Sequence, residues 1–192
     1  MLTKALLISL RILIFRAGPE DFPYDPSPRL SAACLVLALV SGTLFCVLLV
    51  PTPFALLGSM LNIGLLAAAI RASLAARKLQ NRFQQAFNAL LVTTSLLTLA
   101  MLPFMVQLAP VYVELAHKLI QNPELTQQPD QIAAIVGPVS GSFMAVFALL
   151  LWLLAVTAYV FFKSAGTVAL IVLFSLLLLM SLFDGLVGGG VG

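Results

Sequence analysis

The stretch "AACLVLALVSGTLFCVLLVPTPFALLGSMLNIGLLAAAI" (Ala32–Ile70) decides the fold of this chain. Two apolar runs, Ala32–Val50 and Phe54–Ile70, flank the three residues "PTP". A helix of about 20 apolar residues crosses a bilayer, and neither run shows the strict apolar–polar alternation of a strand. Because three residues leave no room for a loop, the sequence predicts two spans that form a tight antiparallel hairpin.

Very few charged side chains accompany this apolar character. Of the 192 residues, 61% are hydrophobic and 9% are charged, whereas a soluble domain carries about 25% charged residues. So few charges cannot cover a water-facing surface, and the chain is therefore predicted to be a polytopic membrane protein. The net charge of +3 does not indicate a nucleic-acid partner, because the basic residues lie beside apolar segments instead of forming a patch.

Three further apolar runs are long enough to cross a bilayer. They are Ala86–Ala109, Val139–Phe161 and Ala165–Phe183. The sequence thus predicts an all-α bundle of five transmembrane helices over residues 32–183, followed by a flexible Gly-rich tail at 184–192.

The basic residues predict the orientation of these spans. With the N-terminus in the cytoplasm, nine of the ten basic residues lie inside and only Lys118 lies outside, which satisfies the positive-inside rule. The nine are Lys4, Arg11, Arg16, Arg29, Arg71, Arg77, Lys78, Arg82 and Lys163. Five spans then place the C-terminus outside. A bacterial inner membrane fits this pattern, and a eukaryotic endomembrane is the alternative.

Residues 1–16, "MLTKALLISLRILIFR", combine three basic residues with apolar sequence. This pattern predicts an amphipathic helix in the cytoplasmic interface, with Leu6, Leu10 and Leu13 directed toward the acyl chains. A signal peptide is disfavoured because Arg11 interrupts the apolar run and no small-residue cleavage site follows. The alternative is a sixth helix that enters or spans the membrane.

Residues 17–31 form a Pro-rich, acidic connector. Its four prolines forbid a helix and hold the chain extended or turned. Two interpretations stay open: a rigid turn into the first span, or a pre-stiffened docking strip that binds a partner at low entropic cost. The candidate partner-binding residues are Glu20, Asp21, Phe22, Tyr24 and Asp25.

No catalytic or metal-binding group is predicted. His117 is the only histidine, no Cys/His cluster has ligand spacing, and no nucleophile–base pair can be assembled. Cys34 and Cys46 lie about 18 Å apart along one helix, too far for a disulfide. We therefore expect no enzyme activity and no cofactor. The outer loop at 110–131 is predicted to carry a separate surface helix, "PVYVELAHKLI".

Polar residues inside the spans suggest packing faces or a pore. Asn62 lies four residues after Gly58 and shares a helix face with it, a combination suited to close packing with an interhelical hydrogen bond. The third predicted span is the most polar, with Asn88, Thr94 and Thr98. Four of these five residues, Asn62, Asn88, Thr94 and Thr98, are also the candidates to line a hydrated path.

Two stretches carry a resemblance to a known family. These are "RFQQAFNALLVTTSLLTLAMLPF" (Arg82–Phe104) and "LLWLLAVTAYVFFKSAGTVALIVLFSLLLL" (Leu150–Leu179). With the five-span layout, they resemble the third span and the closing pair of spans of the Yip-domain family of membrane proteins. The resemblance implies a five-span fold and a non-enzymatic, partner-binding role. The eukaryotic Asp-Leu-Tyr-Gly-Pro signature is missing, since "PEDFPYDP" stands in its place, so no GTPase-binding residue is carried over.

The leading interpretation is a non-catalytic membrane adaptor or accessory subunit. It would contact membrane lipids and another membrane protein or protein complex, through its cytoplasmic N-terminal segment and its transmembrane faces. The alternative is a small transporter or channel lined by the polar residues of spans two and three.

Overall fold

The computed structural model describes residues 2–25, 28–49, 52–124 and 129–167, and all regular structure in these ranges is helical. The all-α prediction is thereby confirmed for this part of the chain. The elements are α1 (Leu2–Leu13), η1 (Pro19–Asp21), α2 (Pro28–Val47), α3 (Thr52–Ala76), η2 (Gln80–Arg82), α4 (Phe83–Gln121), α5 (Pro129–Val136), η4 (Gly137–Val139) and α6 (Ser140–Ala165).

Four helical stretches of the described chain are long and apolar enough to cross a membrane. They contain α2, α3, α4 and the run from α5 to α6, as expected of a membrane helical bundle. The fifth predicted span, Ala165–Phe183, lies outside the described residues from position 168 onward, and so does the tail at 184–192.

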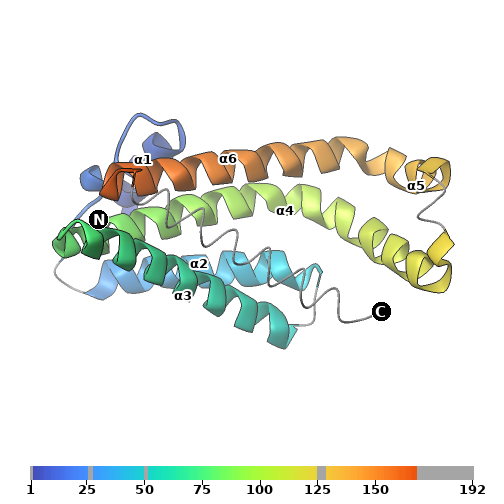
Figure 1. Ribbon diagram of the computed structural model, residues 1–192, viewed down its shortest axis with the longest axis horizontal. Coiled ribbons are helices and arrows are strands. Elements are labelled where there is room, and N and C mark those ends of the chain that lie inside the picture. The colour runs from blue at the N-terminus through green and yellow to red at the C-terminus, as the bar shows by residue number, and fades with distance from the viewer. Residues whose placement is uncertain (1, 26–27, 50–51, 125–128, 168–192) are drawn as a thin grey trace.

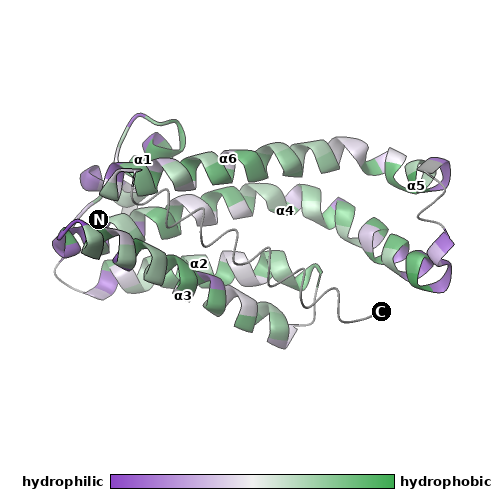
Figure 2. Ribbon diagram, in the orientation of Figure 1, coloured by the Kyte–Doolittle hydropathy of each residue, from purple (hydrophilic) through white to green (hydrophobic). Residues whose placement is uncertain are grey.

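Helix α4 is the central element of the bundle. It packs against α2 on one side and α6 on the other, while α3 packs mainly against α2 (Figure 1). Ala89, Leu90 and Leu91 of α4 are at most 1% exposed. The neighbouring helices α2 and α3 run antiparallel, as the short "PTP" joint predicts (Figure 1). Hydrophobic residues make up most of the helical bundle, and hydrophilic residues gather at its two ends (Figure 2).

The prediction of a separate surface helix in the loop at 110–131 is wrong, because α4 continues without a break to Gln121. It runs for 39 residues, with Pro103 and Pro110 inside it, a length of about 58 Å. Proline costs a helix one hydrogen bond but can be accommodated in a long packed helix. Together with α5 and α6, the second half of α4 extends beyond α2 and α3 (Figure 1). Ser142 of α6 donates a hydrogen bond to Gln107 Oε1 of α4 at 2.6 Å, which joins the two helices there.

Helix α1 packs on the bundle itself. Its face formed by Ala5, Ile8, Ser9 and Ile12 is buried against α4 and α6, whereas Leu6, Leu7 and Leu10 are exposed. Leu13, which was expected to face lipid, packs instead against the core. A helix thus forms where the amphipathic pattern predicts one, and its more deeply buried face contacts protein.

Aromatic residues of α6 hold the C-terminal end of α1. Trp152 Nε1 donates a hydrogen bond to the Leu13 carbonyl at 3.1 Å, and the Tyr159 hydroxyl lies 3.5 Å from the Phe15 carbonyl. The Phe15 ring contacts both of these rings, with centroids 5.4 and 5.1 Å away. The Trp152 bond satisfies the Leu13 carbonyl, one of those that the helix end leaves without an intrahelical partner.

Candidate functional site

The connector between α1 and α2 is fixed on the first turn of α4. Gln84 Nε2 donates to the Asp25 carbonyl at 2.8 Å and lies 3.0 Å from Ser31 Oγ. Gln85 Nε2 donates to the Phe22 carbonyl at 3.0 Å. Two adjacent glutamines therefore hold the connector through its backbone, so its path does not depend on most of its own side chains. The sequence reasoning missed both glutamines; the adjacent pair opening an apolar span was the available signal.

The structure divides the five candidate partner-binding residues into two groups. Phe22 is 1% exposed and belongs to the hydrophobic core, and Asp25 is also buried. Asp21 Oδ2 accepts a hydrogen bond from the Gly18 backbone N–H at 2.9 Å, which closes the η1 turn. The expectation that Phe22 offers aromatic surface to a partner is thus corrected: its ring leaves water by packing into the protein. Glu20 and Tyr24 are the two exposed residues without such a structural task, with Tyr24 59% exposed.

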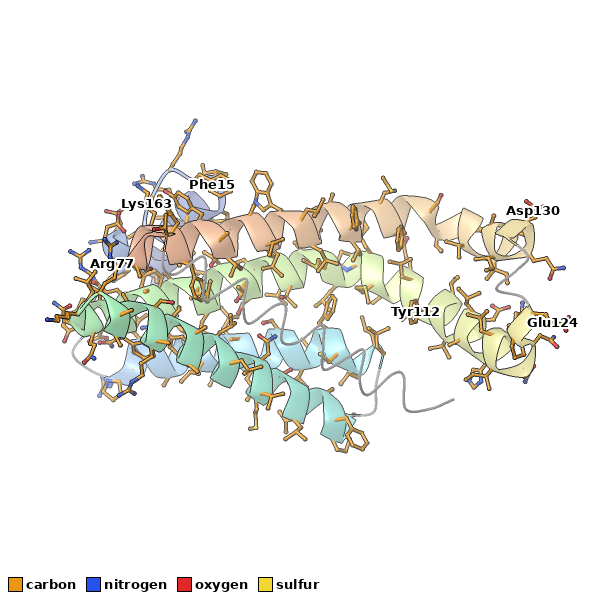
Figure 3. All side chains as sticks on the ribbon, in the orientation of Figure 1. Phe15, Arg77, Tyr112, Glu124, Asp130 and Lys163 are labelled. Carbon is orange, nitrogen blue, oxygen red and sulfur yellow. The ribbon has the colours of Figure 1, made fainter. Side chains whose placement is uncertain are left out.

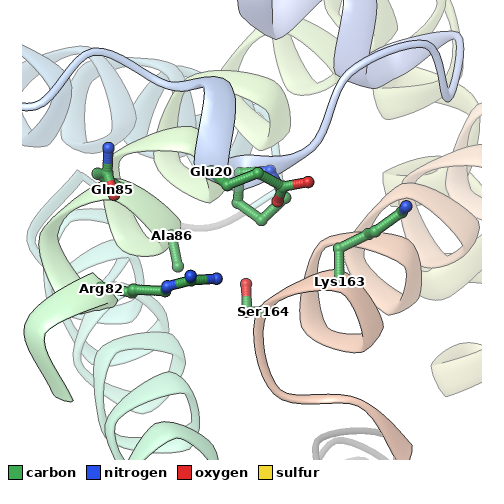
Figure 4. Close-up of a pocket in the computed structure, with 7 residues that line it drawn as sticks. Glu20, Arg82, Gln85, Ala86, Lys163 and Ser164 are labelled. Atoms are coloured by element: carbon green, nitrogen blue, oxygen red, sulfur yellow. The ribbon is translucent and has the colours of Figure 1, made fainter. Parts of the chain in front are cut away.

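Glu20 faces two basic residues across a narrow crevice. The crevice is lined by Glu20 of η1, Arg82 at the end of η2, Gln85 in the first turn of α4, and Lys163 and Ser164 at the end of α6. The Arg82 side chain extends across it toward Ser164 (Figure 4). Within the described ranges, the only ion pair within 4 Å is Glu114–Lys118 at 2.7 Å, near the far end of α4. In the described structure, Glu20 therefore forms no ion pair with Arg82 or Lys163, and Lys163 Nζ lies 5.9 Å from the centroid of the Tyr159 ring.

The two ends of the bundle differ strongly in charge. The nine basic residues assigned above to the cytoplasmic side belong to α1, the connector, the start of α2, the end of α3, the start of α4 and the end of α6. These segments meet at one end of the bundle, where Arg77 and Lys163 lie, whereas Glu124 and Asp130 lie at the other (Figure 3). Among the described charges, that first end carries nine basic and three acidic residues, and the other carries one and three.

A cavity of about 540 Å³ opens between α2, α3, α4 and α6. Four of the five residues proposed to pack helices or line a pore lie on its wall: Gly58, Asn62, Thr94 and Thr98. Spacing on one helix face suggests Gly58 and Asn62, and the polarity of the third predicted span suggests Thr94 and Thr98; the fold brings the four together. The remaining wall is mostly leucine and other apolar residues, with small residues on α2 and α3.

The polar groups of this cavity are suited to packing or weak binding. Ser41, Ser59, Thr94 and Ser95 each donate their hydroxyl proton to a carbonyl of their own helix, at 2.6–3.2 Å. No acidic, basic or histidine side chain belongs to the described wall, so these residues provide no acid–base pair. No group of three or more His, Cys, Asp or Glu that could hold a metal ion occurs in the described ranges.

Asn88, the fifth of those residues, lies away from the cavity. It is 1% exposed, and its Nδ2 lies 2.9 Å from Ser31 Oγ of α2. Its Oδ1 is a buried acceptor without a partner in the described structure. Asn88 thus joins α4 to α2 beside the connector, which is the packing role and not the pore-lining one.

No family model, no curated protein and no solved structure matches this chain.

Proposed function

We propose that this chain is a non-catalytic integral membrane protein that binds another membrane protein or complex through its connector. The observation that carries the proposal is that Gln84 and Gln85 hold the connector backbone while its residues Glu20 and Tyr24 stay exposed. A loop that is already ordered loses little conformational entropy when it binds. An exposed tyrosine and an exposed carboxylate in one ordered loop fit a partner surface that combines an apolar pocket with a basic group.

The proposed setting is a bacterial inner membrane with the connector in the cytoplasm. The nine basic residues at the connector end support this orientation through the positive-inside rule. Helix α1 would then lie at the cytoplasmic interface, with its exposed leucines toward lipid and its buried face on the bundle. The layout that resembles the Yip-domain family agrees with a partner-binding role.

Loss of the Glu20 and Tyr24 side chains is expected to abolish partner binding. Glu20→Gln/Tyr24→Ser removes the charge and the aromatic ring without altering Phe22, Asp21 or the glutamine bonds. The measurement is affinity purification in a mild detergent, together with photo-crosslinking from a benzoylphenylalanine placed at Tyr24.

The matched control is Glu124→Gln/Tyr112→Ser at the opposite end, where Tyr112 is 66% exposed (Figure 3). We expect one protein to co-purify with the wild type and the control but to be at least tenfold depleted from the connector variant. Equal recovery of that protein with both variants would contradict the proposal and show that the connector is only a turn between α1 and α2.

The orientation predicts a clear labelling asymmetry. Single cysteines at Lys78 and Glu124, in a chain without Cys34 and Cys46, are treated with a membrane-impermeant maleimide in intact spheroplasts. We expect Glu124→Cys to react at once and Lys78→Cys to react only after permeabilisation. The reverse pattern would show that the N-terminus is outside.

A second candidate function is transport of a small uncharged solute, and the cavity of about 540 Å³ favours it. Ligand sites have volumes of about 300–1,000 Å³ with mostly apolar walls and a few polar groups, and this cavity meets both criteria. The purified protein in liposomes would have to move a solute, and Asn62→Leu would have to slow that movement.

A further inference from the structure

We propose that the cavity between α3 and α6 is the binding groove for the chain's own apolar segment 168–183, which completes the bundle as its fifth span. This inference is independent of the connector proposal, and it would remove the structural basis for the transport candidate. The segment "VALIVLFSLLLLMSLF" contains two polar residues, Ser175 and Ser181.

Helix α6 ends beside the end of α3. Gly166 caps α6 through its backbone N–H, which donates to the Phe162 carbonyl at 2.7 Å. Its φ of 68° and ψ of −156° take the backbone out of the helical path, in a region open to glycine alone. A Cβ at this position would collide with the Arg77 guanidinium of the α3 end. The chain that follows α6 therefore starts between the ends of α3 and α6, which are the two sides of the groove.

The two serines of the segment lie at the same distances from the turn as two polar residues of the groove. Thr157 lies nine positions before Gly166 and Ser175 nine positions after it, so a helix returning beside α6 places both about 13 Å from the turn. Asn62 lies fifteen positions before Arg77, and Ser181 fifteen positions after Gly166, which gives about 22 Å for each. Thr157 and Asn62 both line the cavity.

The wall of the groove suits a leucine-rich helix. Gly42, Gly58 and Ser59 are small residues that let another helix approach closely. An added Cβ at Gly58 would meet no atom within 4 Å, so there is free space on that side of α3. The opposite wall offers Leu150 and Leu154, each more than 40% exposed. A returning span would cover these leucines and place its two serines opposite the polar groups.

Disulfide crosslinking in native membranes tests the placement directly. The full-length chain carries Cys34→Ala and Cys46→Ala, and the cysteine pairs Thr157→Cys/Ser175→Cys and Asn62→Cys/Ser181→Cys are oxidised with copper phenanthroline. A disulfide requires Cα atoms within about 7 Å. After denaturation, a maleimide-polyethylene glycol reagent counts the remaining thiols. We expect both pairs to lose at least half of their double labelling while the protein stays monomeric on a non-reducing gel.

The matched control is Ala155→Cys/Ser175→Cys. Ala155 lies two positions from Thr157, at nearly the same level, but it is exposed and outside the cavity wall. We expect this pair to keep both thiols. Full double labelling of both groove pairs would overturn the proposal, and so would a disulfide-linked dimer formed by Ser175→Cys alone, since a second copy would then occupy the groove.

Accessibility gives a second measurement that does not depend on disulfide geometry. A single cysteine at Asn62 is expected to resist an aqueous maleimide, because the segment covers it; rapid labelling would overturn the inference and support the transport candidate. The affinity purification described above tests different residues at the end of the bundle. Failure of one proposal therefore leaves the other intact and can be told apart from it.

Discussion

Replacing Phe22 with alanine is expected to lower the free energy of unfolding by about 3–5 kcal/mol, the usual range for a buried phenylalanine. Phe22 is 1% exposed, although it lies in a polar, Pro-rich connector outside the spans. In the unfolded connector this ring faces water, so the variant loses both the transfer free energy and the packing contacts. Reversible unfolding in mixed micelles, followed by circular dichroism, measures the change.

Tyr24→Ala is the matched control for this prediction. Tyr24 lies two positions away in the same connector but is 59% exposed, so its loss is expected to cost less than about 0.5 kcal/mol. An equal loss of stability in the two variants would mean that the burial of Phe22 does not fix the connector. Because Phe22→Ala also frees the connector, limited proteolysis between α1 and α2 should become faster.

Phe161→Ala is expected to have the second largest effect, about 2 kcal/mol. Phe161 is 1% exposed near the end of α6, inside a stretch that is long and apolar enough to span the membrane. A span that separates from its neighbours still lies in lipid, which is as apolar as leucine. The variant therefore loses little free energy of transfer, and the cavity left by the missing ring accounts for most of the destabilisation. The same unfolding experiment measures it.

The adjacent residue provides the control for this second prediction. Phe162 is 47% exposed, and Phe162→Ala should change the free energy of unfolding by only a few tenths of a kcal/mol. Comparable losses for Phe161→Ala and Phe162→Ala would contradict the orientation of α6 against α4. A smaller loss of stability for Phe161→Ala than for Phe22→Ala is expected, because residue 161 stays in lipid when the helices separate, whereas residue 22 becomes exposed to water.

The helical class and the α2–α3 hairpin could be predicted because they depend on local sequence. Run length, the absence of alternation and the short "PTP" joint suffice for these features. The Gly58–Asn62 face was also predictable, since a spacing of four residues places two side chains on one face of any helix. Each of these inferences needs only one segment of the chain.

The features that were missed depend on contacts between distant segments. Gln85 and Phe22 are 63 positions apart, and Trp152 and Leu13 are 139 apart; no local pattern records such pairs. The burial of Phe22 was missed because prolines and acids around it suggested an exposed loop. The continuity of α4 was missed because Pro110 usually marks the end of a helix in water, whereas this long helix retains it.

The unequal charge of the two bundle ends couples the protein to the membrane potential. In the proposed orientation, the described residues place a formal charge of +6 at the inner end and −2 at the outer end. One elementary charge that crosses 100 mV changes the energy by about 2.3 kcal/mol, so inverting the bundle against a negative interior would cost roughly 18 kcal/mol. An energised membrane would therefore hold the protein in the orientation in which it was inserted.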